Sequence, residues 1–421
     1  MKVIHLSYYD TLGGAARAAY RIHTSLLRGG VESKMWVNRA FTGGPTIETS
    51  STLGIRFPYL LRRLFVFPLV NFLKTRNPII HSPSILPSQW LKKINNSDAD
   101  LIHLHWIQNE MLSIEDIEKI KKPLLWTLHD MWGFCGAEHY TEDSRWKNGY
   151  RKNNRPEYES GFDLNLWTWK RKIKNWHKPK QIVTPSTWLS DCVSKSALMR
   201  RWPIITVPNP LDTTKWRQYD KILSRKKFGL PLDKSIILFG SMGGGNEPRK
   251  GLDLLLRALE LYSKMDNSSD FELIIFGLHV SLPSNSSFTI RQLGTFDKDD
   301  DLSMLYSAAD VLSAPSRQEV FGQTASEAHA CGTPVIAFRT GGLIDIVKHK
   351  STGYLADAFD VNDMADGLVW LLKEDNLEAS SRNARLRALS TFSEAVVADQ
   401  YKRLYEDMIK SSKKESFSIS D

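Results

Sequence analysis

The sequence predicts an α/β protein built from two domains that follow one another along the chain. Its 421 residues suit two domains of about 200 residues each. Short apolar runs alternate with helical patterns throughout, which is typical of parallel α/β construction. Twelve of the thirteen tryptophans lie at or before Trp216, so the composition changes between the two halves.

In the first half, short apolar runs predict six strands. They are Val3–Ser7, Lys34–Val37, Leu101–His105, Leu124–Leu128, Ile182–Thr184 and Ile204–Val207. A first helix is predicted after Gly13 and Gly14, because Ala15, Ala19 and Ile22 fall on one helical face. Pro208 and Pro210 interrupt both patterns, so we place the end of this domain at residue 207 and give it residues 1–207.

The second half repeats the same alternation, and we assign it residues 208–390. Its predicted strands are Ser235–Phe239, Leu273–Phe276, Val311–Ala314 and Pro334–Phe338. Its helices are expected from about Gly251 and near 300–309, 323–330 and 361–373. Ser393 is a candidate N-cap for a last amphipathic helix within 391–410. The remaining residues, 411–421, contain few apolar side chains and are predicted to be disordered.

The composition is that of an ordinary globular protein, with 42% hydrophobic and 24% charged residues. No run of 18 uncharged apolar residues occurs, so no membrane-spanning helix is expected. The first residues, Met1–Leu6, are typical of a strand rather than a signal peptide. The three cysteines, Cys135, Cys192 and Cys331, lie far apart, which favours free thiols in a reducing compartment. We therefore expect a cytoplasmic protein.

The net charge of +9 is concentrated in two stretches of the first half. Residues 145–180 hold 11 Lys or Arg against 3 acidic residues, an excess of 11 − 3 = 8. The aromatic residues interleaved with them are Trp146, Tyr150, Trp167, Trp169 and Trp176. A nucleic-acid-binding protein would explain this stretch, but that alternative gives the motifs of the second half no purpose. We therefore expect no nucleic-acid partner.

The second basic stretch, residues 56–76, has five basic residues, no acidic ones, and many Leu, Phe and Val side chains. This mixture is typical of segments that lie on anionic membranes. Pro58 and Pro68 interrupt a continuous helix there, and a partly buried segment is an equal alternative. The stretch predicts a protein associated peripherally with the inner face of the membrane.

The motif richest in chemistry runs from Ser313 to Val335, where a predicted strand leads through a loop into a helix. Gly322 opens that helix, whose first N–H groups have no partner within the helix and favour a phosphate. Glu319 in the loop and Glu327 in the helix can accept hydrogen bonds from sugar or ribose hydroxyls. The pattern therefore predicts a site for a phosphorylated, hydroxyl-rich ligand.

With these residues the chain resembles the retaining family-4 glycosyltransferases of the GT-B fold. Their Glu-x7-Glu element matches Glu319 and Glu327, and their G-x-P-V-I strand matches Gly332–Ile336. Thr340–Val347 resembles their TGG-x-x-E-I-V, with Asp345 in place of glutamate. Further similar stretches are Val207–Asp212, with Pro210 in place of glycine, Ile274–Gly277, Leu293–Phe296 and Leu302–Asp310. Trp126–Trp132 is similar to enzymes of capsule and exopolysaccharide assembly of the colanic-acid type.

The resemblance implies two Rossmann-like domains that face each other across a cleft, with the last helix packing back on the first domain. It implies acceptor binding by the first domain and nucleotide-sugar binding by the second. The expected reaction is retaining sugar transfer to a lipid-linked saccharide or another glycan, in cell-surface polysaccharide assembly, without a metal ion or other cofactor. A phosphorylase or a nucleotide-sugar epimerase on the same fold is the alternative among enzymes.

The resemblance also implies particular site residues. The expected catalytic residues are His129, Glu319, Lys250 and Arg249. The expected donor-binding residues are Gly14, Arg249, Lys250, Gly294, Glu319, Val320, Phe321, Gly322 and Glu327. Lys250 matches the lysine of the family's K-G step. The family's arginine follows a glycine, where this chain has Gly240-Ser241, so we infer that Arg249 takes that role from a longer loop.

Other polar clusters are given structural roles. His103 and His105 alternate onto one face of a strand, and no supporting ligand with suitable spacing predicts a zinc site. The acidic run Asp297–Asp301 lies at a helix start, where the helix dipole favours acids. No Ser-His-Asp arrangement is visible in the sequence.

Overall fold

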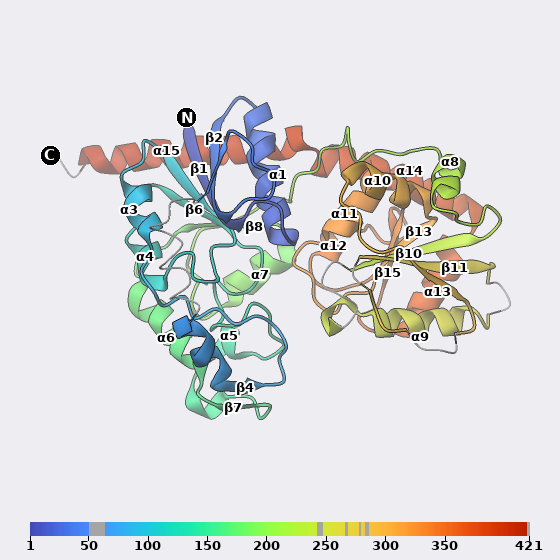
Figure 1. Cartoon of the computed structure of the whole chain (residues 1–421), viewed down its shortest axis with the longest axis horizontal. Helices are drawn as coiled ribbons and strands as arrows, with labels where there is room; N and C mark the ends of the chain where they lie inside the picture. Colours follow the sequence, from blue (N-terminus) through green and yellow to red (C-terminus); the bar gives the residue numbers. More distant parts are fainter. Residues whose placement is uncertain (50–63, 242–246, 266–267, 278, 283–285, 419–421) are drawn as a thin grey trace. The chain divides into compact units, whose positions relative to one another are not determined.

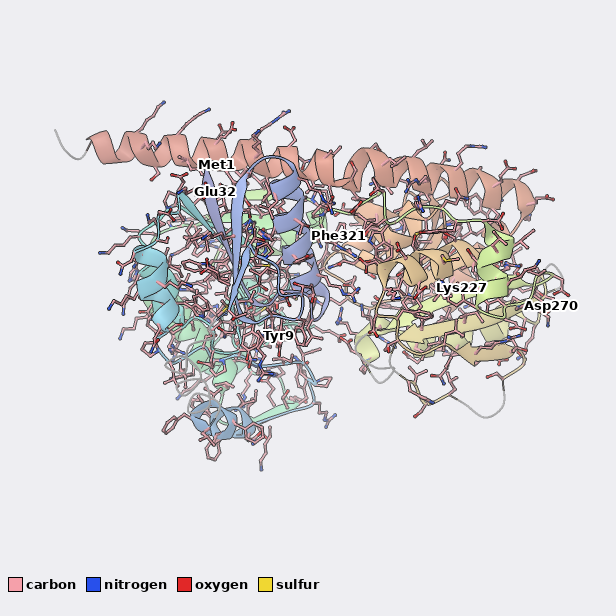
Figure 2. The ribbon with its side chains drawn as sticks, turned by 45° about the horizontal axis from the view of Figure 1, so that its top comes forward. Met1, Tyr9, Glu32, Lys227, Asp270 and Phe321 are labelled. Carbon is pink, nitrogen blue, oxygen red and sulfur yellow. The ribbon has the colours of Figure 1, made fainter. Side chains whose placement is uncertain are left out.

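The computed structural model describes residues 1–49, 64–241, 247–265, 268–277, 279–282 and 286–418 (Figure 1). The chain forms two compact units. The first comprises Met1–Val207 together with Ala398–Asp421, and the second comprises Pro208–Val397. In Figure 2, Tyr9 marks the carboxyl end of the first strand of the first unit, and Phe321 marks a loop of the second.

The first unit contains a seven-stranded parallel sheet in the order β3-β2-β1-β5-β6-β8-β9. The strands are β1 (Lys2–Tyr9), β2 (Glu32–Arg39), β3 (Ile47–Thr49), β5 (Leu101–Leu104), β6 (Leu124–Thr127), β8 (Gln181–Thr184) and β9 (Ile204–Thr206). The order runs outward in both directions from β1 and β5, so the carboxyl ends of these two strands flank the point where the topology switches. In open α/β sheets, ligands bind at such points.

The six strands predicted for this half are all present, and the register of the sheet brings histidines together. β1 pairs with β5 so that His5 lies opposite His103. The helices of the unit are α1 (Gly14–Arg28), α3 (Gln89–Asn95), α4 (Ile114–Glu118), α5 (Arg145–Asn148), α6 (Leu164–Asn175) and α7 (Thr187–Lys195). A small antiparallel pair, β4 (Leu73–Thr75) with β7 (Glu159–Gly161), joins the two basic stretches and was not predicted.

The second unit contains a six-stranded parallel sheet in the order β12-β11-β10-β13-β14-β15. The strands are β10 (Ser235–Ser241), β11 (Phe271–Gly277), β12 (Thr289–Gln292), β13 (Val311–Ala314), β14 (Val335–Phe338) and β15 (Gly353–Ala356). The helices are α8 (Lys221–Lys227), α9 (Leu252–Tyr262), α10 (Asp299–Ala308), α11 (Gln323–Ala330), α12 (Leu343–Ile346), α13 (Val361–Leu371) and α14 (Glu374–Arg387). Ile236 and Leu238 of β10 enter one apolar core, and Ile237 and Phe239 enter another. Both faces of the sheet are therefore buried, as in doubly wound folds.

The chain leaves the second unit through a π-helical turn, Ala388–Phe392, and ends in the long helix α15 (Glu394–Ser418). Tyr401 and Tyr405 of α15 are fully buried in the first unit, which confirms the predicted packing of the last helix on that domain. The prediction of disorder from residue 411 is wrong for 411–418, because α15 continues to Ser418. Once a helix is nucleated, each further residue adds a hydrogen bond even where apolar side chains are few. Residues 419–421 lie outside the described part of the chain.

None of the helices in the described residues has the length and apolar character needed to cross a bilayer.

Candidate active site

The loop between β13 and α11 holds the acidic motif of the second unit. Gly322 is the N-cap of α11 and has a φ of 99°, a region that favours glycine. A Cβ added there would lie 2.7 Å from Cδ2 of Leu343. The side chains of Val320 and Phe321 are buried, so these two residues can offer a ligand only backbone groups. The loop therefore presents backbone N–H groups at the start of α11.

Glu319 in this loop contacts both cations that the sequence singled out. Its Oε2 lies 2.6 Å from Nζ of Lys250 and 3.5 Å from a guanidinium nitrogen of Arg249. Burial alone would raise the pKa of the Glu319 carboxyl, but Lys250 and Arg249 together lower the pKa below its usual value. Glu319 is therefore held as a carboxylate between two positive charges.

A short turn brings the two cations to the loop. Pro248–Lys250 forms one turn of 3₁₀-helix, followed by Gly251 with a φ of 71°. A Cβ on Gly251 would lie 2.0 Å from the carbonyl oxygen of Pro315, so only glycine permits this approach. Arg249 also donates to the carbonyl of Gln318 at 2.7 Å and to the Glu247 carboxylate at 2.8 Å. The structure thus brings Arg249 beside Glu319 from the longer loop, whose residues 242–246 lie outside the described part.

The TGG motif supports the same loop from behind. Gly342 donates its N–H to the carbonyl of Glu319 at 2.7 Å. A Cβ on Gly341 would lie 2.2 Å from that carbonyl oxygen, and one on Gly342 would lie 2.3 Å from the carbonyl oxygen of Val320. Thr340 donates its hydroxyl to the carbonyl of Ser316 at 2.8 Å. These residues fix the backbone that carries Glu319.

Two other predicted donor-binding residues lie around the same end of the sheet. Glu327 on α11 is buried and accepts a hydrogen bond from the hydroxyl of Tyr306 at 3.0 Å. Gly294 has a φ of 72°, and its carbonyl accepts the N–H of Gly277, the last residue of β11, at 2.8 Å. The stretch after β12 is therefore fixed at the carboxyl end of β11. Because Glu327 already has a protein partner, its binding of ribose remains a prediction.

In the first unit, the predicted residues lie at the carboxyl edge of the sheet. Gly14 is the first residue of α1, which follows β1, and Gly13 before it has a φ of 89°. His129 follows β6 and is half-buried. Its Nε2 lies 3.1 Å from Nδ1 of His105. Burial lowers the pKa of His129 to about 4, so its imidazole is neutral at neutral pH.

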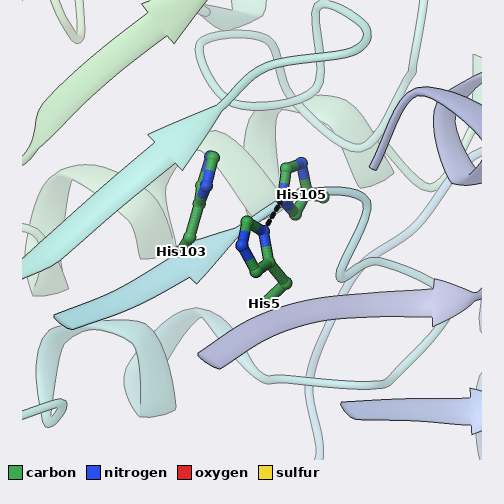
Figure 3. Close-up of side chains that lie close together, drawn as sticks. All are labelled: His5, His103 and His105. Atoms are coloured by element: carbon green, nitrogen blue, oxygen red, sulfur yellow. Dashed lines mark hydrogen bonds between the residues drawn. The ribbon is translucent and has the colours of Figure 1, made fainter. Parts of the chain in front are cut away.

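His5, His103 and His105 form a buried cluster (Figure 3), and His105 of this cluster contacts His129. One nitrogen from each lies within 4.8 Å of the others, close enough to suggest a metal ion. His103, however, uses both nitrogens in hydrogen bonds, to Tyr405 at 2.6 Å and to Thr127 at 2.7 Å. His105 also uses both nitrogens, and the set contains no anionic ligand. These residues fit a hydrogen-bonded core better than a metal centre.

A Ser-His-Asp arrangement does exist, contrary to the interpretation of the sequence. Nδ1 of His139 lies 2.6 Å from the Asp130 carboxylate, and its Nε2 lies 2.9 Å from the hydroxyl of Ser82. The side chain of Trp106 also donates to Asp130, at 2.8 Å. Asp130 and His139 are 9 residues apart, but Ser82 lies 57 residues before His139, which is why the pattern was missed. All three are buried, so the set anchors the loop after His129 rather than presenting a nucleophile.

Three of the five aromatic side chains singled out in the basic stretch 145–180 are internal, although most of its cations are not. Trp146, Tyr150 and Trp176 are buried, so their faces cannot serve as a stacking platform for bases. Arg145 is buried and pairs with Asp143 and Glu159. The nucleic-acid alternative therefore keeps the exposed cations and the two partly exposed aromatic residues, Trp167 and Trp169, but not the other three aromatic residues.

Lys172 is the most deeply buried charge of this stretch. It is fully buried and donates to the carbonyls of Trp132, Cys135 and Gly136, the last two at 3.0 and 2.8 Å. Its ammonium lies 3.7 Å from the ring centre of Trp132. Burial lowers the pKa of Lys172 to about 7. The residue therefore braces the loop that follows His129, a role that a count of charges does not reveal.

Two protein-family models match the chain. The model described as Glycosyltransferase Family 4 matches residues 12–215, and the model described as Glycosyl transferases group 1 matches residues 220–387. The interval between the two matches lies close to the boundary between the two units, at Val207 and Pro208. Each unit thus corresponds to one of the matched models.

A curated relative is the D-inositol 3-phosphate glycosyltransferase of Corynebacterium glutamicum (strain R). It is 34% identical over 198 residues, which cover 44% of this chain and 46% of the relative. The chain spans about half the length of the curated relatives that it matches. Further curated relatives are also D-inositol 3-phosphate glycosyltransferases, so the resemblance to the colanic-acid type is not supported.

Solved structures match over nearly the whole chain. Sucrose-phosphate synthase from Thermosynechococcus elongatus has a TM-score of 0.65 at 18% identity, over 98% of this chain and 100% of that one. Anabaena HepE in complex with UDP-glucose has a TM-score of 0.64 at 16% identity, over 97% and 100%. Such identities show the fold alone, and the predicted pair of Rossmann-like domains is confirmed.

Proposed function

The chain belongs to the group 1 and family 4 glycosyltransferases of the GT-B fold, and from this premise we propose that it moves a sugar from a nucleotide-diphosphate sugar to an acceptor hydroxyl with retention of configuration. The observation that carries the proposal is the contact of Glu319 with Lys250 and Arg249 beside the first turn of α11. Two cations and a helix N-terminus suit a diphosphate, and a carboxylate suits sugar hydroxyls.

The proposed chemistry is mainly electrostatic. As the bond between sugar and diphosphate breaks, negative charge builds on the leaving phosphate, and Lys250, Arg249 and the N–H groups after Gly322 stabilise it. Glu319 accepts hydrogen bonds from the sugar and fixes its position. The leaving phosphate takes the proton of the attacking hydroxyl on the same face, so neither a covalent sugar–enzyme intermediate nor a metal ion is required. HepE has been solved with UDP-glucose, so UDP-glucose is the first donor to test.

The test is nucleotide release from a panel of UDP-, GDP- and ADP-sugars, by the unaltered protein and by Glu319→Gln. We expect release from one donor, reduced about a hundredfold or more in Glu319→Gln, because a group fixing the reacting sugar is lost. Glu378→Gln, an exposed site on α14, is the matched control and keeps full activity. Equal rates in all three proteins would contradict the assignment, as would interconversion of donor sugars without an acceptor, which marks an epimerase.

We further propose that the acceptor is a lipid-linked saccharide reached at the cytoplasmic face of an anionic membrane. The support is the described part of the second basic stretch. Leu64, Phe65, Phe67 and Phe72 are 62 to 67% exposed, and Lys74 of β4, two residues after Phe72, is also exposed. Exposed apolar side chains next to cations are typical of surfaces that dock on anionic bilayers. Residues 56–63 lie outside the described part.

Flotation with vesicles tests this surface. We expect binding to vesicles of anionic phosphatidylglycerol, weaker binding to neutral phosphatidylcholine, and loss of binding in the double variant Phe65→Asp/Phe67→Asp. Ile222→Asp is the control, because Ile222 is 56% exposed but lies on α8 of the other unit. Binding that is the same in the double variant and the control would show that these phenylalanines do not dock. Transfer to free inositol 3-phosphate, the acceptor type named in the similar enzymes, would exclude the lipid-linked acceptor.

A further inference from the structure

Three imidazoles form a hydrogen-bonded row that runs from the core of the first unit to the carboxyl edge of its sheet. Nδ1 of His5 lies 2.9 Å from Nε2 of His105, the contact drawn in Figure 3. Nδ1 of His105 lies 3.1 Å from Nε2 of His129. His5 and His105 are buried, and His129 is half-buried. The row thus connects His129 to the interior.

The protons of such a row are not independent. A neutral imidazole carries one N–H and one bare nitrogen, and burial keeps all three rings neutral because it lowers their pKa values. Each of the two contacts needs one donor and one acceptor. Consequently only two arrangements satisfy both contacts: either all three protons lie on Nδ1, or all three lie on Nε2.

The inner end of the row distinguishes the two arrangements. Nε2 of His5 is buried without a hydrogen-bond partner. If the protons lay on Nε2, this position would be a buried N–H with no acceptor, the rarer kind of unsatisfied group in proteins. If they lie on Nδ1, it is a bare nitrogen, and both contacts of the row are made. The arrangement with all three protons on Nδ1 is therefore favoured. It leaves His129 with its proton on Nδ1.

We propose that His5 and His105 are positioning residues that fix His129 as an Nδ1–H tautomer, so that at the carboxyl edge of the first unit's sheet it acts as a hydrogen-bond donor and not as a base. The role of His129 in the reaction rests on the proposed function, but the tautomer of His129 does not depend on a substrate. It agrees with a reaction in which the leaving phosphate takes the acceptor proton, because such a reaction needs no protein base.

The tautomer can be read directly by nitrogen NMR of the protein with ¹⁵N-labelled histidine at neutral pH, with His129→Asn used to assign the signals. We expect the unaltered protein to show a protonated Nδ1 and a bare Nε2 on His129. Finding the proton on Nε2 of His129 would overturn the proposal. This measurement uses no substrate, so it stays separate from any failure of the glycosyltransferase assignment.

Two variants test the inner end of the row. His5→Leu removes the donor to His105, and we expect the His129 signals to shift toward a mixture of tautomers and kcat to fall at least about fivefold with KM for the donor unchanged. His5→Asn keeps an N–H group near the position of Nδ1, and we expect it to restore both readouts. An unchanged His129 in His5→Leu would overturn the proposal.

The matched control is His23→Leu. His23 is equally buried but bonds Ser33 and Thr46 and does not join the row. We expect this variant to lose stability without a change in the His129 tautomer. If it shifted the tautomer as much as His5→Leu, general loosening of the core would explain the effect. Stoichiometric binding of added Zn²⁺ to the unaltered protein would also count against the proposal, because it would need bare nitrogens that the row commits to hydrogen bonds.

Discussion

Glu319 shows how a single functional side chain is supported from several directions. Lys250 and Arg249 approach its carboxylate, and Gly342 donates to its backbone carbonyl. The carboxylate itself is mostly withdrawn from water, and the two cations offset the cost of that burial. Its position therefore depends on residues from two other segments of the second unit.

Gly342→Ala tests this support at one methyl group. Gly342 has an ordinary helical φ of −71°, so the backbone itself admits alanine, but the new Cβ would lie 2.3 Å from the carbonyl oxygen of Val320. We expect a loss of about 1–3 kcal/mol from overpacking and reduced nucleotide release, because the Glu319 loop must move. Thermal unfolding and the release assay measure both. Gly44→Ala is the control, since its Cβ would meet only Ile47 at 3.8 Å; equal effects of the two would contradict the steric argument.

At the scale of elements, the loop after β6 is held by two buried polar networks. Asp130, His139 and Ser82 tie its ends, and Lys172 from α6 binds three of its carbonyls. The loop carries no regular secondary structure over most of its length, so these side chains take over the satisfaction of its backbone. The position of His129 at the start of the loop depends on them.

Lys172→Met tests the brace. Methionine keeps much of the volume but leaves the carbonyls of Trp132, Cys135 and Gly136 without their shared donor, at a cost of about 1–3 kcal/mol for each group left unsatisfied. We expect a lower urea midpoint of unfolding and a larger loss of activity than in Lys174→Met, an exposed site on the same helix. If the Lys172→Met protein were as stable as the Lys174→Met protein, the loop after β6 would not depend on Lys172 for its conformation.

The helices and strands that were predicted correctly are those whose sequence signal lies within the segment itself. Strands such as β11 and β13 are buried throughout and mostly apolar, with Glu272 and Ser313 as their polar members, because both faces of the sheet are covered. The edge strands β12 and β15 were missed, since four residues with mixed polarity, or with an initial glycine, carry no periodic pattern. The helix starts and glycine turns of the second unit followed from local chemistry.

The site was predicted unevenly for the same reason. Glu319 and Gly322 lie in one strand–loop–helix motif, whereas Lys250 was assigned to the same site only through the family resemblance. The partners of His129 could not be predicted as such, because register and long-range packing bring His5 beside His105 across 100 residues. Lys172 was counted only as one of the 11 Lys or Arg of residues 145–180, and the packing of α6 shows that it is internal.

For the molecule as a whole, buried histidines set the response to acid. The pKa values of His5, His23, His103, His105 and His129 are lowered, chiefly by burial, those of His23 and His129 to about 4. Below pH 6.5, the ordinary pKa of histidine, these histidines become protonated in the unfolded chain but stay neutral in the native protein. Stability therefore falls as pH drops from 6.5 toward 4, with a slope of up to about 1.4 kcal/mol per pH unit for each histidine.

Glu138 opposes this trend with the contribution of one group. Burial raises the pKa of the Glu138 carboxyl to about 7. Its contribution to the stability of the fold is therefore complete below pH 4.5 and is lost as pH rises through 7. The histidines outnumber it, and we expect the urea midpoint to fall from pH 7 to pH 5. Tryptophan fluorescence reports chiefly on the first unit, where eleven of the thirteen tryptophans lie.

His23→Asn removes one of these buried histidines. The free energy of unfolding should then fall less steeply with decreasing pH, by the contribution of one proton. His177→Gln, at an exposed site, should leave this pH dependence unchanged. A midpoint that is constant or rises toward pH 5 would contradict the account.

The first unit is assembled from both ends of the chain, since Ala398–Asp421 belongs with Met1–Val207. His103 receives its partner Tyr405 from a point 302 residues further along, and Tyr401 likewise arrives late beside Thr127. During synthesis on the ribosome, the sheet of the first unit emerges first. His103 and Thr127 then lack their contacts with α15 until the whole second unit has been translated. Pro208–Val397, in contrast, is contiguous and can close as soon as it has emerged. The half of the protein that is made first is therefore finished last.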